Sequence, residues 1–286
     1  MTNITQGKTT IVTKSVTLNA NHSAQLAEFY QDTIGLTLLN EKADLYYWLG
    51  TPDGKVLLEI EQTDSDRKEE TTGLYHLALL LPTYEDLGTI LRHLIISQAN
   101  LIGASDHGYS NAIYLNDPEG NGIEIYWDKD RSEWDILEDG SIAGITEPMD
   151  AEAALEVART TFDKLPNGTT MGHVHLHVDN LDASKEFYTD VLGLGLKYEY
   201  GPAALFLASG DYHHHLGVNI WKQGALSHPE EGDPGMGHTT WTGTAEDIAF
   251  IEEQLSKREM DYLKSENTIT VTDPAGLMHI ITTEDN

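Results

Sequence analysis

Alternating apolar and polar positions occur near the start of the chain and again past its middle, each followed by a segment with helical spacing. In the first copy, residues 15–20 alternate, and the helical segment ends in a Glu-Phe-Tyr triplet at Tyr30. In the second copy, residues 173–178 alternate, and the helical segment ends in the same triplet at Tyr188. A glycine-containing turn follows both. This repeat predicts that the chain consists of two similar halves.

A second, looser repeat lies within each half. In the first half it comprises strands at 55–61, 73–79, 112–115 and 123–126, a helix at about 86–97 and a turn at 117–121. In the last quarter, residues 244–257 have helical spacing and residues 272–276 form the final turn. The pattern predicts four βαβββ modules, at 10–62, 72–128, 170–222 and 235–284.

The predicted fold class is therefore α+β. We expect an N-terminal domain at 8–128 and a C-terminal domain at 168–286, each with two modules. The acidic segment 129–167 is expected to link them, and residues 151–162 within it to form a helix.

Composition narrows the chemistry. Of the 286 residues, 40% are hydrophobic, which is enough for packed cores, and none is cysteine. Disulfides and thiolate metal sites are thus excluded, and any metal must bind nitrogen and oxygen atoms. The sequence lacks the apolar run of a signal peptide and any apolar stretch of about 18 residues, so we expect a cytoplasmic protein that does not span a membrane.

The formal net charge of −30, from 17 basic and 47 acidic residues, argues against anionic binding partners. Such a surface repels phosphate backbones and anionic lipid, so we expect no binding to nucleic acid or to membranes.

Several motifs support a family resemblance. Gly172-His173 opens a strand, a Phe-Tyr pair precedes a Leu-Gly turn, and the turn 117–121 leads to Ile123-Glu124. With four βαβββ modules, the chain resembles the vicinal oxygen chelate superfamily, which includes glyoxalase I, fosfomycin-resistance and bleomycin-binding proteins and extradiol dioxygenases. The resemblance implies two glyoxalase-like domains with cupped mixed sheets. One fold hosts many chemistries, so it does not decide the function by itself.

Three segments suggest a subgroup. Residues 212–221 resemble the strand of two-domain extradiol dioxygenases that carries a His-His pair. Residues 73–82 and 114–118 resemble the bacillary type of catechol 2,3-dioxygenase. This resemblance implies an Fe(II)-dependent extradiol dioxygenase, in which two histidines and one glutamate bind the metal and leave one face open for substrate and O₂.

The ligand pattern of that family is broken in the C-terminal half. His173 and His238 match the two histidine positions, but the glutamate position falls on Ile280, which cannot bind a metal. The neighbouring His279 should point to the opposite face of its strand. The tyrosine that the family places ten residues before the glutamate falls on Thr270.

Module two carries what module four lacks. His76 stands at its first-strand position, Glu124 at its last-strand position, and Tyr114 ten residues before Glu124. Module one offers only Ser15 at the corresponding first-strand position. We therefore predict that module two pairs with module three and that His76, Glu124 and His173 bind Fe(II). Mn(II) is accepted by the same ligand set.

Other arrangements stay open at this stage, including halves that each close on themselves and a chain without a metal. The other ligand sets are His173 and His238 completed by water or Glu284, and Glu59, His76 and Glu124. His175 alternates in phase with His173 and could replace it.

The resemblance also implies residues for the chemistry. His214 matches the acid/base histidine of the family, and a histidine suits that role because its pKa lies near neutrality. Tyr114 is a candidate hydrogen-bond donor to the substrate oxygen, and His107 a candidate second pocket residue. If residues 212–215 form a strand, His213 and His215 should face away from His214.

The implied reactants are a catechol-type substrate and O₂. Two other functions stay open: a glyoxalase-type metal-dependent lyase or transferase, and a non-enzymatic protein that binds a small aromatic ligand. A homodimer is the default expectation for the assembly.

Overall fold

The computed structural model describes residues 5–68, 70–222 and 224–283. Across these residues the strands form two mixed sheets. The eight-stranded sheet has the order β15-β16-β17-β14-β1-β4-β3-β2, and the nine-stranded sheet has the order β11-β12-β13-β10-β5-β8-β7-β6-β9. The α+β class expected from the sequence is confirmed.

Each module follows the order strand, helix and three strands. The first two modules and the linker contain β1 (Val12–Ala20), α1 (Ser23–Phe29), η1 (Tyr30–Ile34), β2 (Thr37–Lys42), β3 (Tyr46–Gly50), β4 (Val56–Gln62), β5 (Gly73–Leu80), α2 (Tyr84–Ile96), β6 (Leu101–Asp106), β7 (Ser110–Asn116), β8 (Gly122–Asp128), η2 (Arg131–Glu133), β9 (Glu147–Pro148) and α3 (Ala151–Val157). The last two contain β10 (Thr170–His177), α4 (Leu181–Glu186), η3 (Phe187–Val191), β11 (Gly195–Tyr200), β12 (Ala204–Ala208), β13 (Leu216–Asn219), β14 (Gly235–Gly243), α5 (Ala245–Lys257), β15 (Tyr262–Ser265), β16 (Thr268–Thr272) and β17 (Met278–Thr283).

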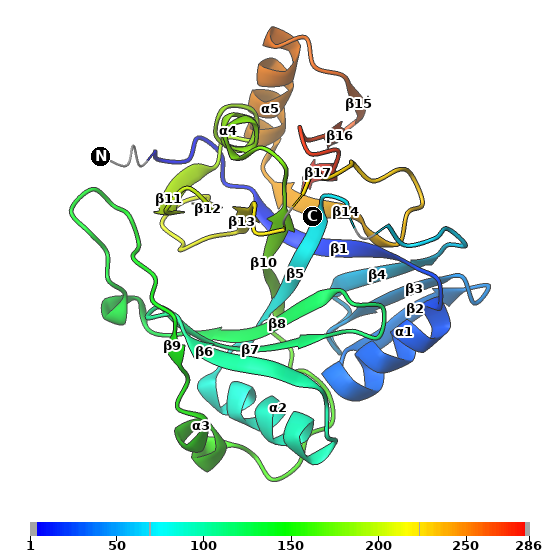
Figure 1. Cartoon of the computed structure of the whole chain (residues 1–286), viewed down its shortest axis with the longest axis vertical. Helices are drawn as coiled ribbons and strands as arrows, with labels where there is room; N and C mark the ends of the chain where they lie inside the picture. Colours follow the sequence, from blue (N-terminus) through cyan, green and yellow to red (C-terminus); the bar gives the residue numbers. More distant parts are fainter. Residues whose placement is uncertain (1–4, 69, 223, 284–286) are drawn as a thin grey trace.

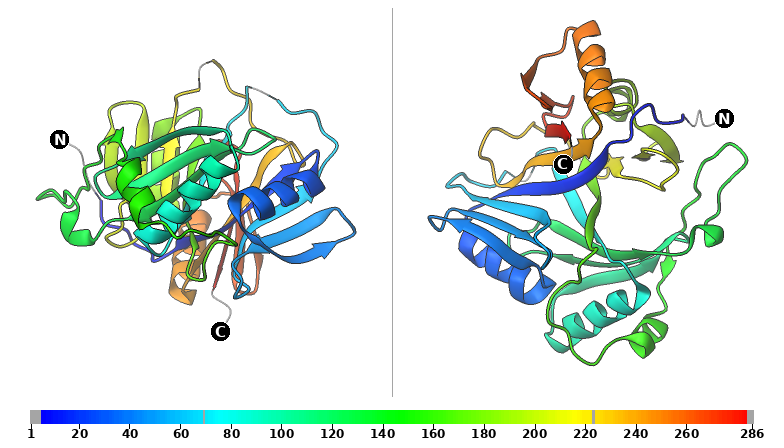
Figure 2. Two further views of the ribbon diagram at one scale, coloured as in Figure 1. Left: turned by 90° about the horizontal axis from the view of Figure 1, so that it is seen from below. Right: turned by 180° about the vertical axis from the view of Figure 1, so that it is seen from behind.

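Each sheet takes one module from each half of the chain. β10 of module three pairs antiparallel with β5 of module two, so that His175 lies opposite His76. β14 of module four pairs in the same way with β1 of module one. The sheets meet where β1 passes β10 (Figure 2). The division into domains at 8–128 and 168–286 with a linker at 129–167 stays a prediction. It follows the sequence repeat, whereas each sheet contains strands from both predicted domains.

The helices lie outside the sheets (Figure 1). α1 packs on β3 and β4, α2 on β8, and α5 on β16 and β17. α2 begins two residues before its expected start, because the side chain of Thr83 accepts a hydrogen bond from the backbone N–H of Asp86 and caps the helix. None of the helices in the described ranges is long and apolar enough to span a membrane.

The linker helix α3 ends at Val157 and is therefore five residues shorter than the predicted 151–162. The guanidinium of Arg92 donates hydrogen bonds to the carbonyls of Leu155, Ala158 and Arg159. It satisfies the carbonyl groups left without helical partners at this end. The linker also contributes β9, which pairs with β6 at the edge of the nine-stranded sheet.

The two Phe-Tyr pairs lie where an α-helix passes into a π-helical turn. Tyr30 donates a hydrogen bond to Asp117, and Tyr188 donates one to Asp273, over 3.1 Å and 2.6 Å respectively. Both acceptors belong to the turns that precede the last strand of the next module. These motifs therefore tie the successive modules of each half together across the two sheets.

The faces of β5 and β10 differ in polarity. Leu77 and Val174 belong to the buried apolar core, on the side of the sheet covered by the helices. Since side chains alternate along a strand, His76 and His173 project to the other face. That face lines the concave interior of the nine-stranded sheet.

Candidate metal centre

Three side chains from neighbouring strands meet on this face. His76 projects from β5, Glu124 from β8 and His173 from β10. The Nε2 atoms of His76 and His173 are 3.3 Å apart, and Oε2 of Glu124 lies 3.0 Å from the first and 3.3 Å from the second. All three residues are buried. In the part of the chain that the structure describes, they form the one group of three or more potential ligands close enough to share a metal ion.

The donor set fits a divalent metal. Two imidazole nitrogens and a carboxylate oxygen point at one another. When the imidazoles are neutral, their lone pairs and the negative carboxylate can together bind a cation. Nδ1 of His173 is buried without a hydrogen-bond partner among the described residues, while Nε2 faces His76 and Glu124 and is the nitrogen that would bind a metal. Two histidines and one carboxylate leave several coordination positions open, as in mononuclear non-haem iron sites.

The protonation states agree with this assignment. Burial lowers the pKa of His173 to about 4, so its ring is neutral near pH 7. Burial acts against the charged form of Glu124, but the interactions with His173 and His76 outweigh it and hold the pKa of this carboxyl well below its usual range. The carboxylate is thus ionised while its neighbour His173 keeps a lone pair for a metal.

Two glycines allow the strands to approach. A Cβ atom on Gly122, which lies opposite His76, would stand 2.1 Å from the carbonyl oxygen of Tyr75. A Cβ on Gly172, next to His173, would stand 1.8 Å from the hydroxyl of Tyr126. The glycine of the Gly-His motif in β10 is therefore required because any side chain at that position would collide with Tyr126.

Replacing Gly172 with alanine is expected to lower the free energy of unfolding by about 1–3 kcal/mol, because the new methyl group collides with the fully buried Tyr126. Gly103→Ala is the matched control, since a Cβ there meets nothing within 4 Å. Urea titrations should give a lower midpoint at unchanged slope for the first variant alone. Equal midpoints for the two variants would contradict the steric explanation.

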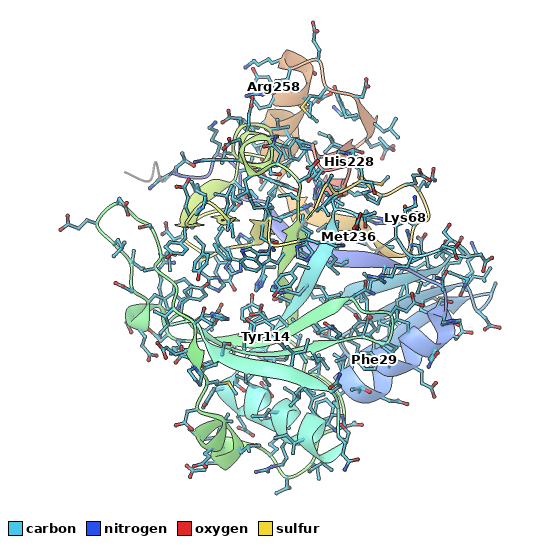
Figure 3. The ribbon with its side chains drawn as sticks, in the orientation of Figure 1. Phe29, Lys68, Tyr114, His228, Met236 and Arg258 are labelled. Atoms are coloured by element: carbon cyan, nitrogen blue, oxygen red, sulfur yellow. The ribbon has the colours of Figure 1, made fainter. Side chains whose placement is uncertain are left out.

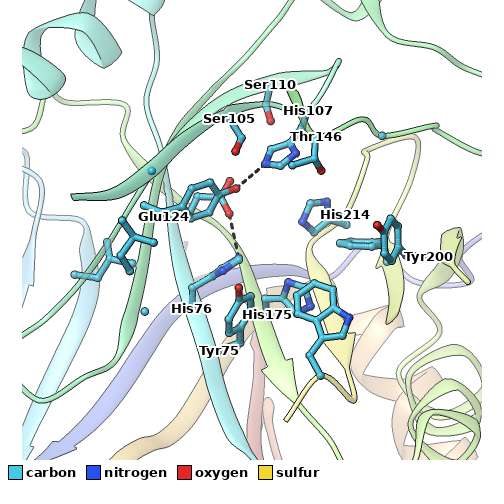
Figure 4. A pocket seen from close by; sticks show the side chains of 18 of the residues that line it. Tyr75, His76, Ser105, His107, Ser110, Glu124, Thr146, His175, Tyr200 and His214 are labelled. Carbon is cyan, nitrogen blue, oxygen red and sulfur yellow. Dashed lines mark hydrogen bonds and ion pairs between the residues drawn. The ribbon is translucent and has the colours of Figure 1, made fainter. Parts of the chain in front are cut away.

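A cavity of about 580 Å³ opens onto His76 and Glu124, within the range of about 300–1,000 Å³ typical of small-molecule sites. Its other lining residues include His214, His175 and Phe206. Figure 4 shows His214 and His175 across the cavity from Glu124. The aromatic and apolar walls suit a planar, apolar ligand with a polar edge turned to the metal ligands.

Tyr114 and His107 lie together in this cavity. Tyr114 points away from β7 on the side opposite α2 (Figure 3). His107 Nδ1 lies 2.9 Å from the carbonyl oxygen of Ile145, so it carries the hydrogen. His107 Nε2 therefore accepts the hydroxyl hydrogen of Tyr114 over 2.6 Å. Burial raises the pKa of Tyr114 well above its usual value, so it stays a phenol. To donate to a ligand, as expected, the hydroxyl must turn away from His107.

The histidine tract differs from the expected strand. β13 begins only at Leu216, so strict alternation does not apply to residues 212–215. The ring of His214 contacts the ring of His173, with centroids 4.1 Å apart. His213 does not face away, since its Nδ1 lies 2.7 Å from Nδ1 of His214. His215 does point elsewhere and accepts a hydrogen bond from the backbone of Ser209.

The alternative ligands are spread apart. His238 is on β14 in the other sheet, where its Nε2 lies 3.0 Å from the hydroxyl of Thr17. Glu59 is on β4 of that sheet. His279 is fully buried between Trp241 and Tyr188, which confirms that it faces the core. Glu284 and the predicted end of module four at 284 lie outside the described residues.

Sequence reasoning missed Asp128, which lies beside the centre as the partner of His213. Asp128 ends β8, and its Oδ1 lies 2.9 Å from Nε2 of His213. The signal for Asp128 was present in the spacing, since Glu124 and Asp128 are four residues apart and so share one face of the strand.

The chain matches the family model described as Glyoxalase/Bleomycin resistance protein/Dioxygenase superfamily over residues 13–125 and 170–285. It is 39% identical over 262 residues to the Catechol-2,3-dioxygenase of Bacillus subtilis (strain 168), across 88% of this chain and 90% of that protein.

Solved structures share the fold at low identity. A candidate dioxygenase from Bacillus subtilis superposes with a TM-score of 0.66 at 13% identity, covering 98% of this chain and 87% of that chain. Glyoxalase I from Zea mays superposes with a TM-score of 0.57 at 13% identity, covering 96% and 92%. Because the family model covers most of both halves and the 39% identity extends over most of the chain, this protein belongs to the Glyoxalase/Bleomycin resistance protein/Dioxygenase superfamily.

Proposed function

We propose that this protein is an Fe(II)-dependent extradiol dioxygenase that opens a catechol-type ring with O₂. The observation that carries the proposal is the meeting of His76, Glu124 and His173 beside a cavity that also contains His214. The 39% identity to a Catechol-2,3-dioxygenase supports the same reaction class. Mn(II) is the alternative metal, since it accepts the same donors.

A bound Fe(II) would acidify the catechol hydroxyls and collect substrate and O₂ in one coordination sphere. The protein residues around it have separate tasks. His76, Glu124 and His173 would bind the metal from one side. Apolar walls such as Phe206 and Trp221 would orient the ring and exclude water.

His214 is the proposed acid/base. Burial lowers its pKa well below the usual value, which keeps the resting ring neutral with a lone pair for the substrate proton but also makes it a weaker base than an exposed histidine. The same nitrogen can return the proton later in the cycle. Tyr114 and His107 are proposed as hydrogen-bonding residues for the substrate oxygens, with the Tyr114 hydroxyl turning from His107 to donate to the substrate.

We propose a catechol-type substrate and O₂ as the reactants, a cytoplasmic location, and a homodimer as the default assembly. Nucleic acid and membranes are not expected partners, because of the net charge of −30.

The function is tested by loading the protein with Fe(II) without air, adding catechol and O₂, and recording the yellow ring-opened semialdehyde together with oxygen uptake. We expect yellow product and one O₂ consumed per ring. Zn(II)-loaded protein is the control and should be inactive, because zinc has no redox chemistry. Iron binding without product from unsubstituted or alkyl-substituted catechols would contradict the proposal. Activity with Ni(II) or Zn(II) on a thiol adduct would favour a glyoxalase-type reaction.

A further inference from the structure

A chain of hydrogen bonds leads from the cavity to a partly buried carboxylate at the end of β8. Nδ1 of His214 lies 2.7 Å from Nδ1 of His213, and Nε2 of His213 lies 2.9 Å from Oδ1 of Asp128. Both histidines are buried, with exposed fractions of 5% and 2%. His214 lines the cavity while His213 does not, so the chain has one end at the site and the other behind it.

The carboxylate fixes the direction of the hydrogen bond between Asp128 and His213, and the direction of the one between His213 and His214 follows for the neutral form of His213. A carboxylate only accepts, so the hydrogen between Asp128 and His213 is on Nε2 of His213. A neutral His213 then has a lone pair at Nδ1, and His214 must donate from its own Nδ1. The hydrogen of neutral His214 is therefore on Nδ1, and its Nε2 keeps a lone pair. Among the described residues no partner contacts that Nε2.

The far end of the chain is rigidly built. The ring of His213 lies between those of Tyr109 and Tyr212, with centroids 4.3 Å and 4.0 Å away. Tyr212 donates a hydrogen bond to the second oxygen of Asp128, and the hydroxyl of Tyr126 lies 2.8 Å from that of Tyr212. Asp128 thus has a partner for each oxygen, and stacking restricts the rotation of His213.

One strand connects this arrangement to the metal centre. Glu124, Tyr126 and Asp128 alternate along β8, so they share the face that looks into the sheet. Glu124 meets the two metal-binding histidines, while Asp128 meets His213. Gly172 leaves room for the hydroxyl of Tyr126 between them. The positions of the metal carboxylate and of the His214 ring are therefore set by the same strand.

We propose that Asp128 and His213 are positioning residues that hold His214 in the tautomer with hydrogen on Nδ1, so that Nε2 presents a lone pair to the substrate hydroxyl. Their effect on turnover rests on the proposed dioxygenase function, but the tautomer itself does not. A histidine without this partner would exchange between two tautomers and two ring orientations, and only some of these could accept the proton.

The tautomer is measured by long-range ¹H–¹⁵N NMR on protein with ¹⁵N-labelled histidine, loaded with diamagnetic Zn(II). We expect His214 to show a protonated Nδ1 and an unprotonated Nε2. Hydrogen on Nε2 of His214 in the wild-type protein overturns the proposal, whatever the activity.

Two variants at one position separate positioning from packing. His213→Leu removes the acceptor, and we expect a roughly 10–100-fold lower kcat in the iron-loaded enzyme, with KM and iron content within about twofold of wild type. His213→Asn can present an oxygen where Nδ1 stood, and we expect it to recover the Nδ1-H tautomer and most of kcat. Wild-type kcat in His213→Leu, or equal losses in both folded variants, overturns the proposal.

Asp128→Leu covers the case in which His213→Leu does not fold, since it removes the acceptor oxygens of Asp128 at a similar side-chain size. We expect its His214 nitrogen signals to move away from the wild-type pattern and its kcat to fall without a change in KM. An unchanged tautomer in this variant overturns the proposal. If no form of the protein cleaves a catechol, the dioxygenase function fails, while the NMR result still decides whether Asp128 and His213 set the tautomer.

Discussion

Replacing Glu124 with alanine is expected to weaken metal binding by roughly 100-fold and to abolish ring cleavage at ordinary iron concentrations. Four-ligand metal sites release about 10–16 kcal/mol, or about 3 kcal/mol per ligand, which corresponds to this factor. The loss is aggravated because His76 and His173 stay buried without the carboxylate that both contact. The measurements are iron content after desalting and the rate of yellow product formation. His76→Ala should behave in the same way.

His238→Ala is the control for this prediction. His238 is a strand histidine like those at the centre, but it is only partly buried and lies on β14 of the other sheet, where it contacts Thr17. Its loss should leave iron content and kcat within about twofold of wild type. If His238→Ala lost iron while Glu124→Ala kept it, the metal site would have to be sought in the C-terminal half.

Removing the metal with a chelator should reproduce the Glu124→Ala result in the wild-type enzyme, and added Fe(II) should reverse it.

The repeat in the sequence predicted the module order because hydrophobic periodicity depends on local structure. Strand positions such as those of His76 and Glu124 could therefore be assigned by counting from a turn. The pairing of modules could be inferred only indirectly, from the Ile at position 280 and the complete set in module two. In the structure, β5 and β10 lie side by side, and the three proposed ligands come within 4.8 Å of one another.

Other features depended on contacts that no local pattern shows. The end of α3 at Val157 is capped by Arg92, which is distant in sequence. The tract before Leu216 lies outside β13: a side-chain contact to Asp128 of β8 holds His213, and in the described part of the tract only His215 makes backbone hydrogen bonds to the neighbouring strands. For this reason the hydrogen bond between His213 and His214 could not be predicted from the sequence, although the family resemblance had pointed to His214. The direction of the Tyr114 hydroxyl likewise depends on the carbonyl of Ile145, which comes from the linker.

His214→Ala is expected to lower kcat by about 10²–10⁴-fold while iron binding stays intact, because positioned acid/base groups contribute about that factor. The side chain contacts the ring of His173 but does not belong to the proposed ligand set, so its removal leaves the metal donors in place. Oxygen uptake and product formation should fall together, and anaerobic catechol binding, followed by its absorption change on the iron enzyme, should stay within about tenfold of wild type.

His215→Asn is the matched control within the same tract. His215 is buried next to His214, but its Nδ1 accepts from the backbone of Ser209 and its ring stacks on Tyr212, away from the cavity lining. An asparagine keeps the acceptor, so kcat should stay within about twofold of wild type if only His214 moves the proton. Similar losses in both variants, with iron retained, would mean that disturbance of the tract suffices to slow turnover. Full activity of His214→Ala would remove His214 from the chemistry and leave proton transfer to a residue on the opposite wall, where Tyr114 and His107 already share a hydrogen bond.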